Sequence, residues 1–473
     1  MSSASREHGL GGSKAAIDWA TMEQWDRSYY LHAVQAQDEF SYVPIERTDG
    51  NYLELPDGTR LLDFQSQLIS DSMGHRHPRV HAEIKEAMER YGHVFFGLAT
   101  DYRARAAKLI IKDALAGEEW AGRVRILASG SEAVENSLAM ARHFTGRPIV
   151  LTQEHSYHGL TMGTTRLRGY RGQLSPVDSL DESRDIPGFP GSGVVEIPAP
   201  EFYDYSGPRP LPSLERTRAI IEEIGPEQIA GVITEAMFGA AGLLPPDDYL
   251  VGLRKLSKEY DFLWIADEVL TGFGRLGEWF GYQCYPGIEP DLMVIGKGLN
   301  GCALPCGAVV TRKDIGEWFE GARWWSGSTH DAHPLICASI VGNIEAMIED
   351  DVIGTVKRLG AYLERNLNDL AARHPCVGRV SGKGMYFAVD LVDAQGEPIV
   401  PDDRSTRFVG ELSDHPNNVI ARECAARGVF LGGFVPNTIK VAPPFTVSED
   451  EIDTGLRAFD AALAEIDTRI ASG

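Results

Sequence analysis

The sequence predicts an α/β protein built on a mostly parallel sheet whose two faces are covered by helices. From about residue 78, short apolar runs alternate with helical patterns, as in chains of strand–helix units. The apolar runs contain few polar residues, which is typical of strands buried on both faces. With 473 residues, 43% of them apolar, the chain can bury a sizeable core and divide into two or more domains.

The expected elements can be followed along the chain. Asp57-Gly58 lies between two apolar runs and predicts a hairpin turn. Residues 124–129 (VRILAS) predict a buried strand that leads directly into a helix over 132–144. A further helix is expected over 247–260. The other strands of the sheet are expected at 148–152, 229–235, 262–269, 291–296 and 307–311.

The pattern divides the chain into three segments. Residues 1–65 form an N-terminal segment, which we assign to a smaller domain, and residues 66–332 form the large domain. Residues 333–473 begin with two helices, continue with a strand, a helix and a strand, and end in a helix over 448–471, which predicts an α+β small domain. A stretch rich in Pro, Gly and Asp at about 170–215 predicts a long loop that is functional or packed over a partner.

Charge and cysteine content exclude several classes of function. The formal net charge of −23 disfavours binding to nucleic acid or to anionic lipid. No apolar run reaches the ~18 residues of a membrane span, and the first twenty residues lack the apolar core of a signal peptide. Six scattered cysteines do not form a disulfide framework. We therefore expect a soluble cytoplasmic protein with reduced thiols.

Several familiar motifs are absent or fail in their context. Residues 272–277 (GFGRLG) match a dinucleotide fingerprint, but Asp267-Glu268 just before them would repel a pyrophosphate and no good helix follows. The chain has no Gly-x-Ser-x-Gly elbow and no Walker A loop, which disfavours serine hydrolases and P-loop NTPases. No metal site is predicted, because no HExxH motif or completing carboxylate accompanies the histidines at 75, 77, 81, 155 and 158.

Three features point to chemistry. Strand 124–129 ends in a Ser-Gly-Ser-Glu turn at a helix start, where Gly130 and Ser131 could bind a phosphate, although the motif taken alone favours Ser131 as a simple N-cap. Asp267 ends an apolar strand, at the edge where such sheets bind ligands. Lys297 follows another strand between two glycines and suits a nucleophilic amine that forms a Schiff base. A structural ion pair between the last two residues is the alternative.

Taken together, these residues resemble the class III (ω-) aminotransferases of pyridoxal phosphate fold type I. The resemblance extends from about residue 40 to the last helix, and IADEVLTGFGR followed by GKG about two dozen residues later is its most specific part. The matching segments, in the order of that family, are SGSEAVENSLAMAR, YHG, TEAMFGAAG, IADEVLTGFGR, GKGLNG, STHDAHPL and APPFTVSEDEID. The resemblance implies a large domain with a mainly parallel seven-stranded sheet, a smaller α+β domain, and a homodimer, and it leaves open whether dimers pair into a tetramer.

The same resemblance implies a role for individual residues. Lys297 would hold pyridoxal 5'-phosphate (PLP) as an internal aldimine and move protons between the substrate Cα and the cofactor. Asp267 would pair with the pyridine nitrogen and keep it protonated. Tyr157 and Val269 would pack on the two ring faces. The remaining residues implied to bind the cofactor are Gly130 and Ser131 at its phosphate, Thr329 from the neighbouring subunit, and His158, Gly159 and Glu235 around it.

Departures from the family pattern concern the substrate. Many relatives have an arginine shortly before the APP motif, which binds a substrate α-carboxylate and can swing to the glutamate equivalent to Glu235. Here the segment is FLGGFVPNTIKVAPP, with no arginine, so Arg166, Arg404 or Arg407 must serve or the acceptor is held differently. This ending resembles that of taurine and ω-amino-acid aminotransferases. It implies a primary amine or ω-amino acid as donor, such as taurine or β-alanine, and pyruvate or 2-oxoglutarate as acceptor.

Three other functions remain open at this stage. A PLP-dependent aminomutase or isomerase would use the same lysine and aspartate without consuming a 2-oxo acid. A non-catalytic PLP-binding relative would have no reason to keep Lys297, Asp267 and Ser131 together. A nicotinamide-dependent dehydrogenase rests on the glycines of 272–277 alone.

Overall fold

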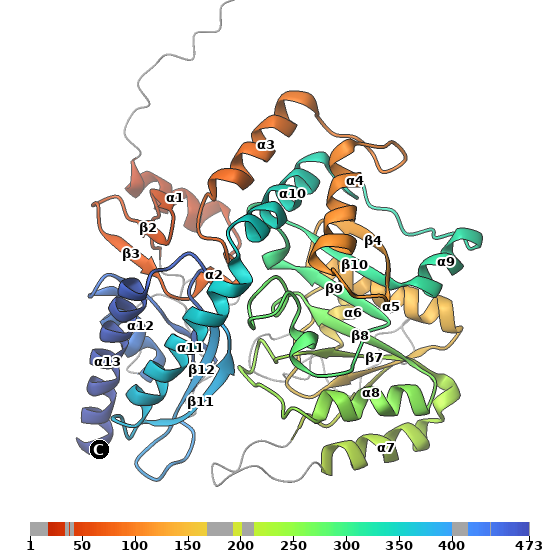
Figure 1. Ribbon diagram of the computed structural model, residues 1–473. Coiled ribbons are helices and arrows are strands. Elements are labelled where there is room, and N and C mark those ends of the chain that lie inside the picture. Colours follow the sequence, from red (N-terminus) through yellow and green to blue (C-terminus); the bar gives the residue numbers. More distant parts are fainter. Residues whose placement is uncertain are drawn as a thin grey trace, which may run out of the picture.

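The computed structural model describes residues 18–33, 37, 42–167, 193–200, 212–399, 415–435 and 437–472. A seven-stranded sheet forms its centre, in the order β4-β10-β9-β8-β7-β5-β6 (Figure 1). Strand β10 is antiparallel to both neighbours, and the pairs from β9 to β6 are all parallel. The strands are β4 Ala121–Leu127, β5 Ile149–Gln153, β6 Val194–Ile197, β7 Ile229–Glu235, β8 Leu263–Glu268, β9 Leu292–Gly296 and β10 Gly307–Arg312. The predicted α/β class and mainly parallel sheet are confirmed.

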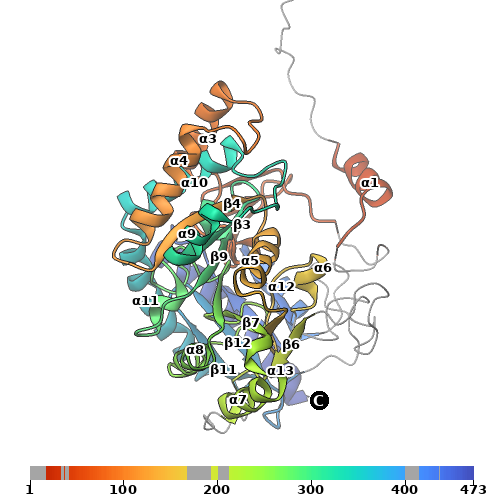
Figure 2. The ribbon, with the colours of Figure 1, turned by 90° about the vertical axis from the view of Figure 1, so that its right-hand side faces the viewer.

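Both faces of this sheet are buried, as the continuous apolar runs predict. Along β10, Val309 packs into a cluster with helix α5, whereas Ala308 and Val310 belong to the large cluster on the other face, which includes residues of α4 and α10. Helices α5 and α4 accordingly lie on opposite sides of the sheet (Figure 2). Alternation of side chains along a strand places every second residue on each face.

The helices agree with the sequence pattern in most places. They are α1 Trp19–Tyr29, α2 Ser66–Ile69, α3 Pro78–Arg90, α4 Asp101–Lys108, α5 Gly130–Thr145, α6 Met162–Thr165, α7 Pro212–Ile224, α8 Tyr249–Glu259, α9 Lys313–Gly321, α10 Pro334–Glu349, α11 Val352–Ala371, α12 Pro416–Ala425 and α13 Glu449–Ser472. Shorter helical turns are η2 Leu109–Ala114, η4 Pro226–Gln228, η5 Gly281–Cys284 and η6 Lys297–Asn300. None of the described helices is long and apolar enough to cross a bilayer.

The expected loop at 170–215 was only partly right. Strand β6 lies inside this stretch and pairs in parallel with β5, and α7 begins at Pro212. The strand was missed because its four residues, VVEI, are flanked on both sides by Pro and Gly, which are typical of loops. The rest of the predicted loop lies outside the described residues.

Two smaller sheets lie beside the large one. Strands β1 Arg47–Asp49, β2 Tyr52–Glu54 and β3 Arg60–Asp63 form a meander with the predicted turn at Asp57-Gly58, and β3 pairs in parallel with β13 Val429–Phe430. The second sheet has the order β11-β12-β15-β14 and lies with α11 to α13 on the left of Figure 1. Its strands are β11 Val377–Lys383, β12 Tyr386–Leu391, β14 Gly433–Val435 and β15 Thr438–Val441.

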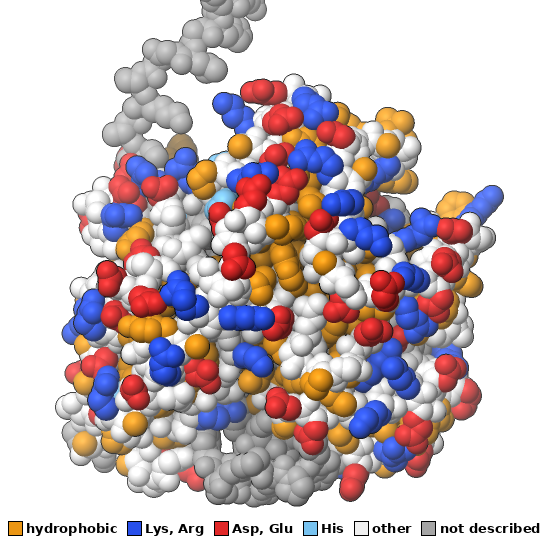
Figure 3. Space-filling view, in the orientation of Figure 1, with side chains coloured by type: hydrophobic (Ala, Val, Ile, Leu, Met, Phe, Trp, Pro, Cys, Tyr) orange, Lys and Arg blue, Asp and Glu red, His pale blue; other side chains and the backbone are white. Residues whose placement is uncertain are grey.

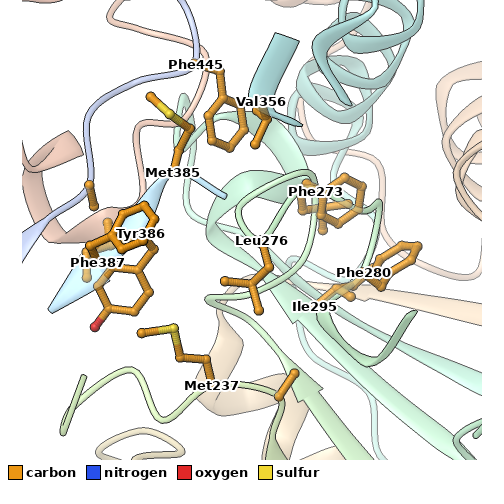
Figure 4. Close-up of a cluster of buried hydrophobic side chains, with 14 of the residues drawn as sticks. Met237, Phe273, Leu276, Phe280, Ile295, Val356, Met385, Tyr386, Phe387 and Phe445 are labelled. Atoms are coloured by element: carbon orange, nitrogen blue, oxygen red, sulfur yellow. The ribbon is translucent and has the colours of Figure 1, made fainter. Parts of the chain in front are cut away.

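A buried apolar cluster joins the large sheet to the C-terminal sheet (Figure 4). Met237 follows β7, Phe273 and Leu276 follow β8, and Tyr386 and Phe387 come from β12, and all five side chains are almost fully buried. This packing holds β12 and its neighbour β15 against the ends of β7 and β8.

Candidate active site

Three neighbouring parallel strands carry ionisable residues where they end. Strand β7 ends at Glu235, Asp267 lies at the end of β8, and Lys297 directly follows β9. Glu235 and Asp267 are opposite each other in the strand register. The carboxyl edge of a parallel sheet is where α/β proteins bind their ligands. The fold therefore places Glu235, Asp267 and Lys297 at one edge of the sheet. The sequence predicted this position for Asp267 and Lys297.

Asp267 is buried and held by two donors from the protein. Its Oδ2 lies 2.6 Å from His158 Nδ1, and its Oδ1 accepts a hydrogen bond of 3.0 Å from the backbone N–H of Val269. The other ring nitrogen of His158, Nε2, is buried and has no hydrogen-bond partner among the described residues. His158 thus fixes the orientation of Asp267.

Glu235 is also buried, and backbone N–H groups bind both of its oxygens. Oε1 accepts from the Tyr157 N–H at 2.9 Å, and Oε2 accepts from the Gly239 N–H at 2.7 Å. Burial and the neighbouring Asp267 raise the pKa of Glu235 to about 7. The carboxylate therefore ties the segment around Tyr157 to the turn after β7.

Lys297 begins the short helix η6 with a φ of 41°, in the left-handed region that only a few non-glycine residues adopt. Burial lowers its pKa, an effect that the charges of Glu235 and Asp267 oppose. A buried amine with a lowered pKa is more often neutral and is then a nucleophile. The position and charge of Lys297 fit Schiff-base chemistry better than the structural ion pair that the sequence left open, since no ion pair of Lys297 with Asp267 is formed among the described residues.

The N-terminus of α5 provides donors for an anion, and one sequence-based alternative was wrong here. The N-cap is Ser129, whose Oγ accepts from the Glu132 N–H at 3.1 Å, so Ser131 is not the cap. Ser131 Oγ instead accepts from the Leu160 N–H at 3.3 Å. The helix start therefore has a free hydroxyl proton beside its unpaired backbone N–H groups, which is the donor set that phosphates bind.

Close packing brings the other predicted residues to the same place. A Cβ on Gly159, whose φ is 122°, would lie 2.3 Å from Ser131 Oγ, and a Cβ on Gly130 would lie 3.2 Å from a methyl group of Val269. Val269 also lies 3.3 Å from where a Cβ on Gly296 would be. Glycine at these positions keeps Ser131, Val269 and the start of α5 in contact, and only glycine adopts the φ of residue 159 without strain.

The glycine run 272–277 is part of a turn. Buried Glu268 accepts hydrogen bonds from Thr271 Oγ1 at 2.5 Å and from the backbone N–H groups of Gly281 and Tyr282, both at 2.7 Å. The segment that follows is the short helix η5 and not a long helix that could face a pyrophosphate. The dehydrogenase alternative therefore loses its structural basis.

Thr329 is the one predicted site residue that is exposed, in the turn before α10. The next residue, His330, lies near His93 and His333, and one ligand nitrogen from each of the three lies within 4.8 Å of the others. However, His333 Nδ1 already accepts from the Leu335 N–H at 3.3 Å as the N-cap of α10. This histidine cluster was not predicted from the sequence. Helix capping explains the position of His333.

The structure describes one of the three arginines suggested for carboxylate binding. Arg404 and Arg407 lie outside the described residues, and Arg166 is half-buried at the end of α6. The sequence analysis missed Lys440 of β15, which is buried and donates a hydrogen bond of 2.8 Å from Nζ to the carbonyl of Gly239. The sequence could have indicated Lys440, because a lysine is unusual within the mostly apolar run TIKVA.

Comparisons with known proteins agree with this site. The aminotransferase class-III family matches residues 33–463 of the chain. The chain is 33% identical to a putrescine–pyruvate aminotransferase of Pseudomonas aeruginosa, over 86% of this chain and 88% of that protein. It is similar to the crystal structure of an S-selective transaminase from Bacillus megaterium, with 41% identity, a TM-score of 0.89 and coverage of 96% and 99%. A taurine:2-oxoglutarate aminotransferase from Bifidobacterium kashiwanohense, solved in complex with PLP and glutamate, matches with 26% identity, a TM-score of 0.87 and the same coverage.

Class III aminotransferases use PLP, and the residues of this site fit that cofactor. A buried aspartate suits a pyridinium nitrogen, a buried lysine suits an aldehyde, and the start of α5 suits a phosphate. Among the described residues the buried His158 Nε2 has no hydrogen-bond partner, which leaves a polar atom next to Asp267 for a further group. From its family match and its site, the chain belongs to the class III aminotransferases.

Proposed function

We propose that this aminotransferase takes its amino group from a primary amine or an ω-amino acid, taurine or β-alanine among them, and transfers it to pyruvate or 2-oxoglutarate. The observation that carries this proposal is the pairing of Glu235. Each of its oxygens accepts a hydrogen bond from a backbone N–H group, and no arginine among the described residues pairs with it. The arginine that many relatives place before the APP motif binds an α-carboxylate, so a site without it is better suited to a donor whose acid group is remote or absent.

The chemistry is divided between the cofactor and the chain. Bound PLP supplies an electron sink that stabilises negative charge at the substrate carbon next to nitrogen. In our proposal Lys297 holds the cofactor and moves the proton at the substrate Cα. Asp267, oriented by His158, keeps a positive charge on the ring nitrogen. Glu235 holds the backbone of Tyr157 in place beside the ring.

The other residues bind and orient. We propose that Ser131 and the first N–H groups of α5, at Gly130 and after it, bind the cofactor phosphate, because a helix N-terminus favours an anion. Tyr157 and Val269 would cover the two ring faces, with His158 and Gly159 forming the turn behind Tyr157. Close packing of Val269 against Gly130 and Gly296 supports this arrangement.

A donor panel tests the substrate proposal. The PLP-loaded protein is incubated with taurine, β-alanine, putrescine or α-alanine, each with and without pyruvate or 2-oxoglutarate, and the aminated acceptor is quantified. We expect a product from ω-amino donors only when a 2-oxo acid is present, and none from Lys297→Ala. A rearranged amine formed without any acceptor would instead support the aminomutase alternative. PLP binding without turnover of any donor would support a non-catalytic relative.

We further propose a homodimer with shared active sites. Thr329 is exposed, and apolar side chains are exposed nearby: Phe96 packs against Gly327, and Phe96 and Trp325 are 50% and 83% exposed. Exposed apolar patches of this kind mark protein interfaces. A second copy seated here would bring its Thr329 to the phosphate of the first. Such dimers could pair into tetramers.

A mixing experiment tests the shared site. We expect Lys297→Ala and Thr329→Asp to be nearly inactive alone, and a mixture of both, exchanged and reassembled, to regain up to about a quarter of the wild-type activity. One site of each mixed dimer would then have both Lys297 and an intact Thr329. No recovery despite confirmed subunit exchange would show that Thr329 serves its own subunit. Light scattering gives the number of subunits.

We also propose the domain division 1–65, 66–332 and 333–473, with the first and third segments together as the small domain. The pairing of β3 with β13 supports the association of these two segments.

The six cysteines are free, which supports a reducing compartment such as the cytoplasm. On the face shown in Figure 3 acidic and basic side chains are interspersed, which offers no basic surface for nucleic acid.

A further inference from the structure

Lys440 is a buried cation with few partners. It lies in β15, its exposed fraction is 6%, and its Nζ donates one hydrogen bond, to the Gly239 carbonyl at 2.8 Å. An ammonium group has three N–H donors. Among the described residues, no second acceptor binds it, so two donors of a buried cation remain available.

The surroundings of Lys440 connect it with the reactive edge of the large sheet. Gly239, whose carbonyl it binds, donates its own N–H to Glu235 Oε2 at 2.7 Å. The same carbonyl accepts a hydrogen bond of 2.9 Å from the Tyr386 hydroxyl of β12. Gly239 therefore links Lys440 to Glu235, because its carbonyl binds Lys440 and its N–H binds Glu235.

Charged groups from each packed element set the protonation of Lys440. Burial lowers the pKa of Lys440 to about 7; the neighbouring Lys297 adds to this effect when it is protonated, and Glu235 opposes it. On β12, Tyr386 is neutral because burial raises its pKa, and Asp390 is engaged by Arg379 at 2.9 Å and by Thr438 at 2.7 Å. In the part of the chain that the structure describes, Lys297 and Glu235 are thus the charged groups that act on Lys440.

A purely structural role does not explain this residue well. A methionine or leucine would fill the same apolar space without the cost of burying a charge, and Tyr386 already satisfies the Gly239 carbonyl. A buried cation that keeps two donors free is the arrangement expected of an anion-binding group before its ligand arrives. Among the substrates proposed above, the 2-oxo acid brings a carboxylate to the site whichever amine is the donor.

We propose that Lys440 binds the carboxylate of the 2-oxo acid acceptor, in the role that an arginine before the APP motif would otherwise have. The inference rests on the proposed function, since it assumes a 2-oxo acid acceptor. It makes Lys440 a specificity-determining residue for acceptors. It also makes recognition depend on pH, because only the protonated amine attracts a carboxylate and a lysine, unlike an arginine, loses its proton in the neutral range.

The test compares two three-carbon acceptors. Pyruvate carries a carboxylate and propanal does not, so the ratio of their KM values isolates carboxylate recognition from all other steps. In Lys440→Met, which keeps the length and packing of the side chain, we expect the KM for pyruvate to rise about 10–100-fold while the KM for propanal stays within about 2-fold. In Lys440→Arg we expect the ratio to return to within about 3-fold of the wild type.

The pH profile adds a readout that a structural role would not change. In the wild type, the KM ratio of pyruvate to propanal should rise as pH increases from 6 to 8.5, because Lys440 loses its proton through about 7. In Lys440→Arg the ratio should be flat over this range. The matched control is Tyr386→Phe, which removes the other donor to the Gly239 carbonyl and should leave the ratio unchanged.

The outcomes separate this inference from the proposed function. An unchanged ratio in Lys440→Met, an equal rise of both KM values, or the same change in Tyr386→Phe would overturn the role of Lys440. If the wild type turns over neither acceptor, the proposed function fails on its own. Calorimetric titration with pyruvate then still tests Lys440: binding at least 10-fold weaker in Lys440→Met supports the inference, and equal binding refutes it.

Discussion

The two sides of the active site differ in how their charges are paired. At the ends of β7 and β8, Asp267 and Glu235 each have both oxygens bound by donors of the chain itself. On the facing strand β15, Lys440 has a single hydrogen bond to a carbonyl. Both sides are buried, so the difference does not arise from access to water.

This difference in pairing separates binding of the cofactor, which is the same in every reaction, from binding of the acceptor, which can vary. Charges that the chain satisfies completely are held in one geometry, which a reaction with a constant cofactor requires. A cation that is left partly unpaired has a free energy cost that a ligand can remove on binding. The cofactor edge is therefore expected to be sensitive in kcat, and β15 in the KM for the acceptor.

The largest effect is expected at Lys297. Lys297→Ala should lower kcat by at least about 10³-fold with every donor and acceptor, because no other described lysine takes its place at the end of β9. Borohydride treatment of the PLP-loaded wild type should fix the cofactor to Lys297, as peptide mass spectrometry can show. Attachment to Lys440 instead would reverse the roles that we assign to the two lysines.

The next effect is expected at Asp267. Asp267→Asn keeps the shape and can still accept from the Val269 N–H, but it removes the negative charge. We expect kcat to fall about 100-fold, with the KM for pyruvate and for propanal changed by less than about 3-fold. A rise confined to the KM of the carboxylate acceptor would contradict the division between the two sides.

The sequence could predict the cofactor side of this comparison but not the other. Strands 229–235 and 291–296 were predicted within one residue of β7 and β9, because continuous apolar runs between turn residues leave little choice. Glu235, Asp267 and Lys297 end such strands, so topology alone brings them together. Lys440 meets Gly239 only through tertiary packing of β12 and β15 against the turn after β7, which no local pattern encodes.

The same reasoning explains two other errors. Ser129, and not Ser131, is the N-cap of α5. A Ser-Gly-Ser sequence does not show which of its two serines has the extended backbone of an N-cap. Strand β6 was missed because four residues have too little periodicity to outweigh flanking Pro and Gly. Local boundaries depend on backbone angles that the tertiary structure decides.

A smaller effect is expected where the chain packs around the phosphate site. A Cβ in Gly159→Ala would lie 2.3 Å from Ser131 Oγ and would also strain a backbone with φ at 122°. We expect about 10–100-fold weaker PLP binding, measured by fluorescence titration of the cofactor-free protein. Ser131→Ala, the matched control for the hydroxyl alone, should weaken PLP binding by about 10-fold. Unchanged PLP affinity in both variants would show that the cofactor phosphate does not bind at this helix start.

The smallest effect on catalysis is expected at His75, a fully paired charge of the N-terminal region. Burial alone would lower its pKa, but hydrogen bonds and charges from Asp63, at 3.2 Å, and from Asp71 raise it to about 9. Because the folded-state pKa is raised from 6.5, the stabilisation is complete below pH 6.5 and is lost as pH rises through 9.

Thermal unfolding of the wild type and of His75→Gln checks this expectation. The wild type should be more stable by about 2 kcal/mol at pH 6.5, and the difference should shrink toward pH 10, while kcat and both acceptor KM values at pH 7 stay within about 2-fold. A constant difference across this range would mean that His75 is not charged in the folded protein. A change in the pyruvate-to-propanal ratio would be more informative, since it would show that paired charges outside β15 also set acceptor choice. The contrast between paired and unpaired groups would then fail as an explanation of specificity.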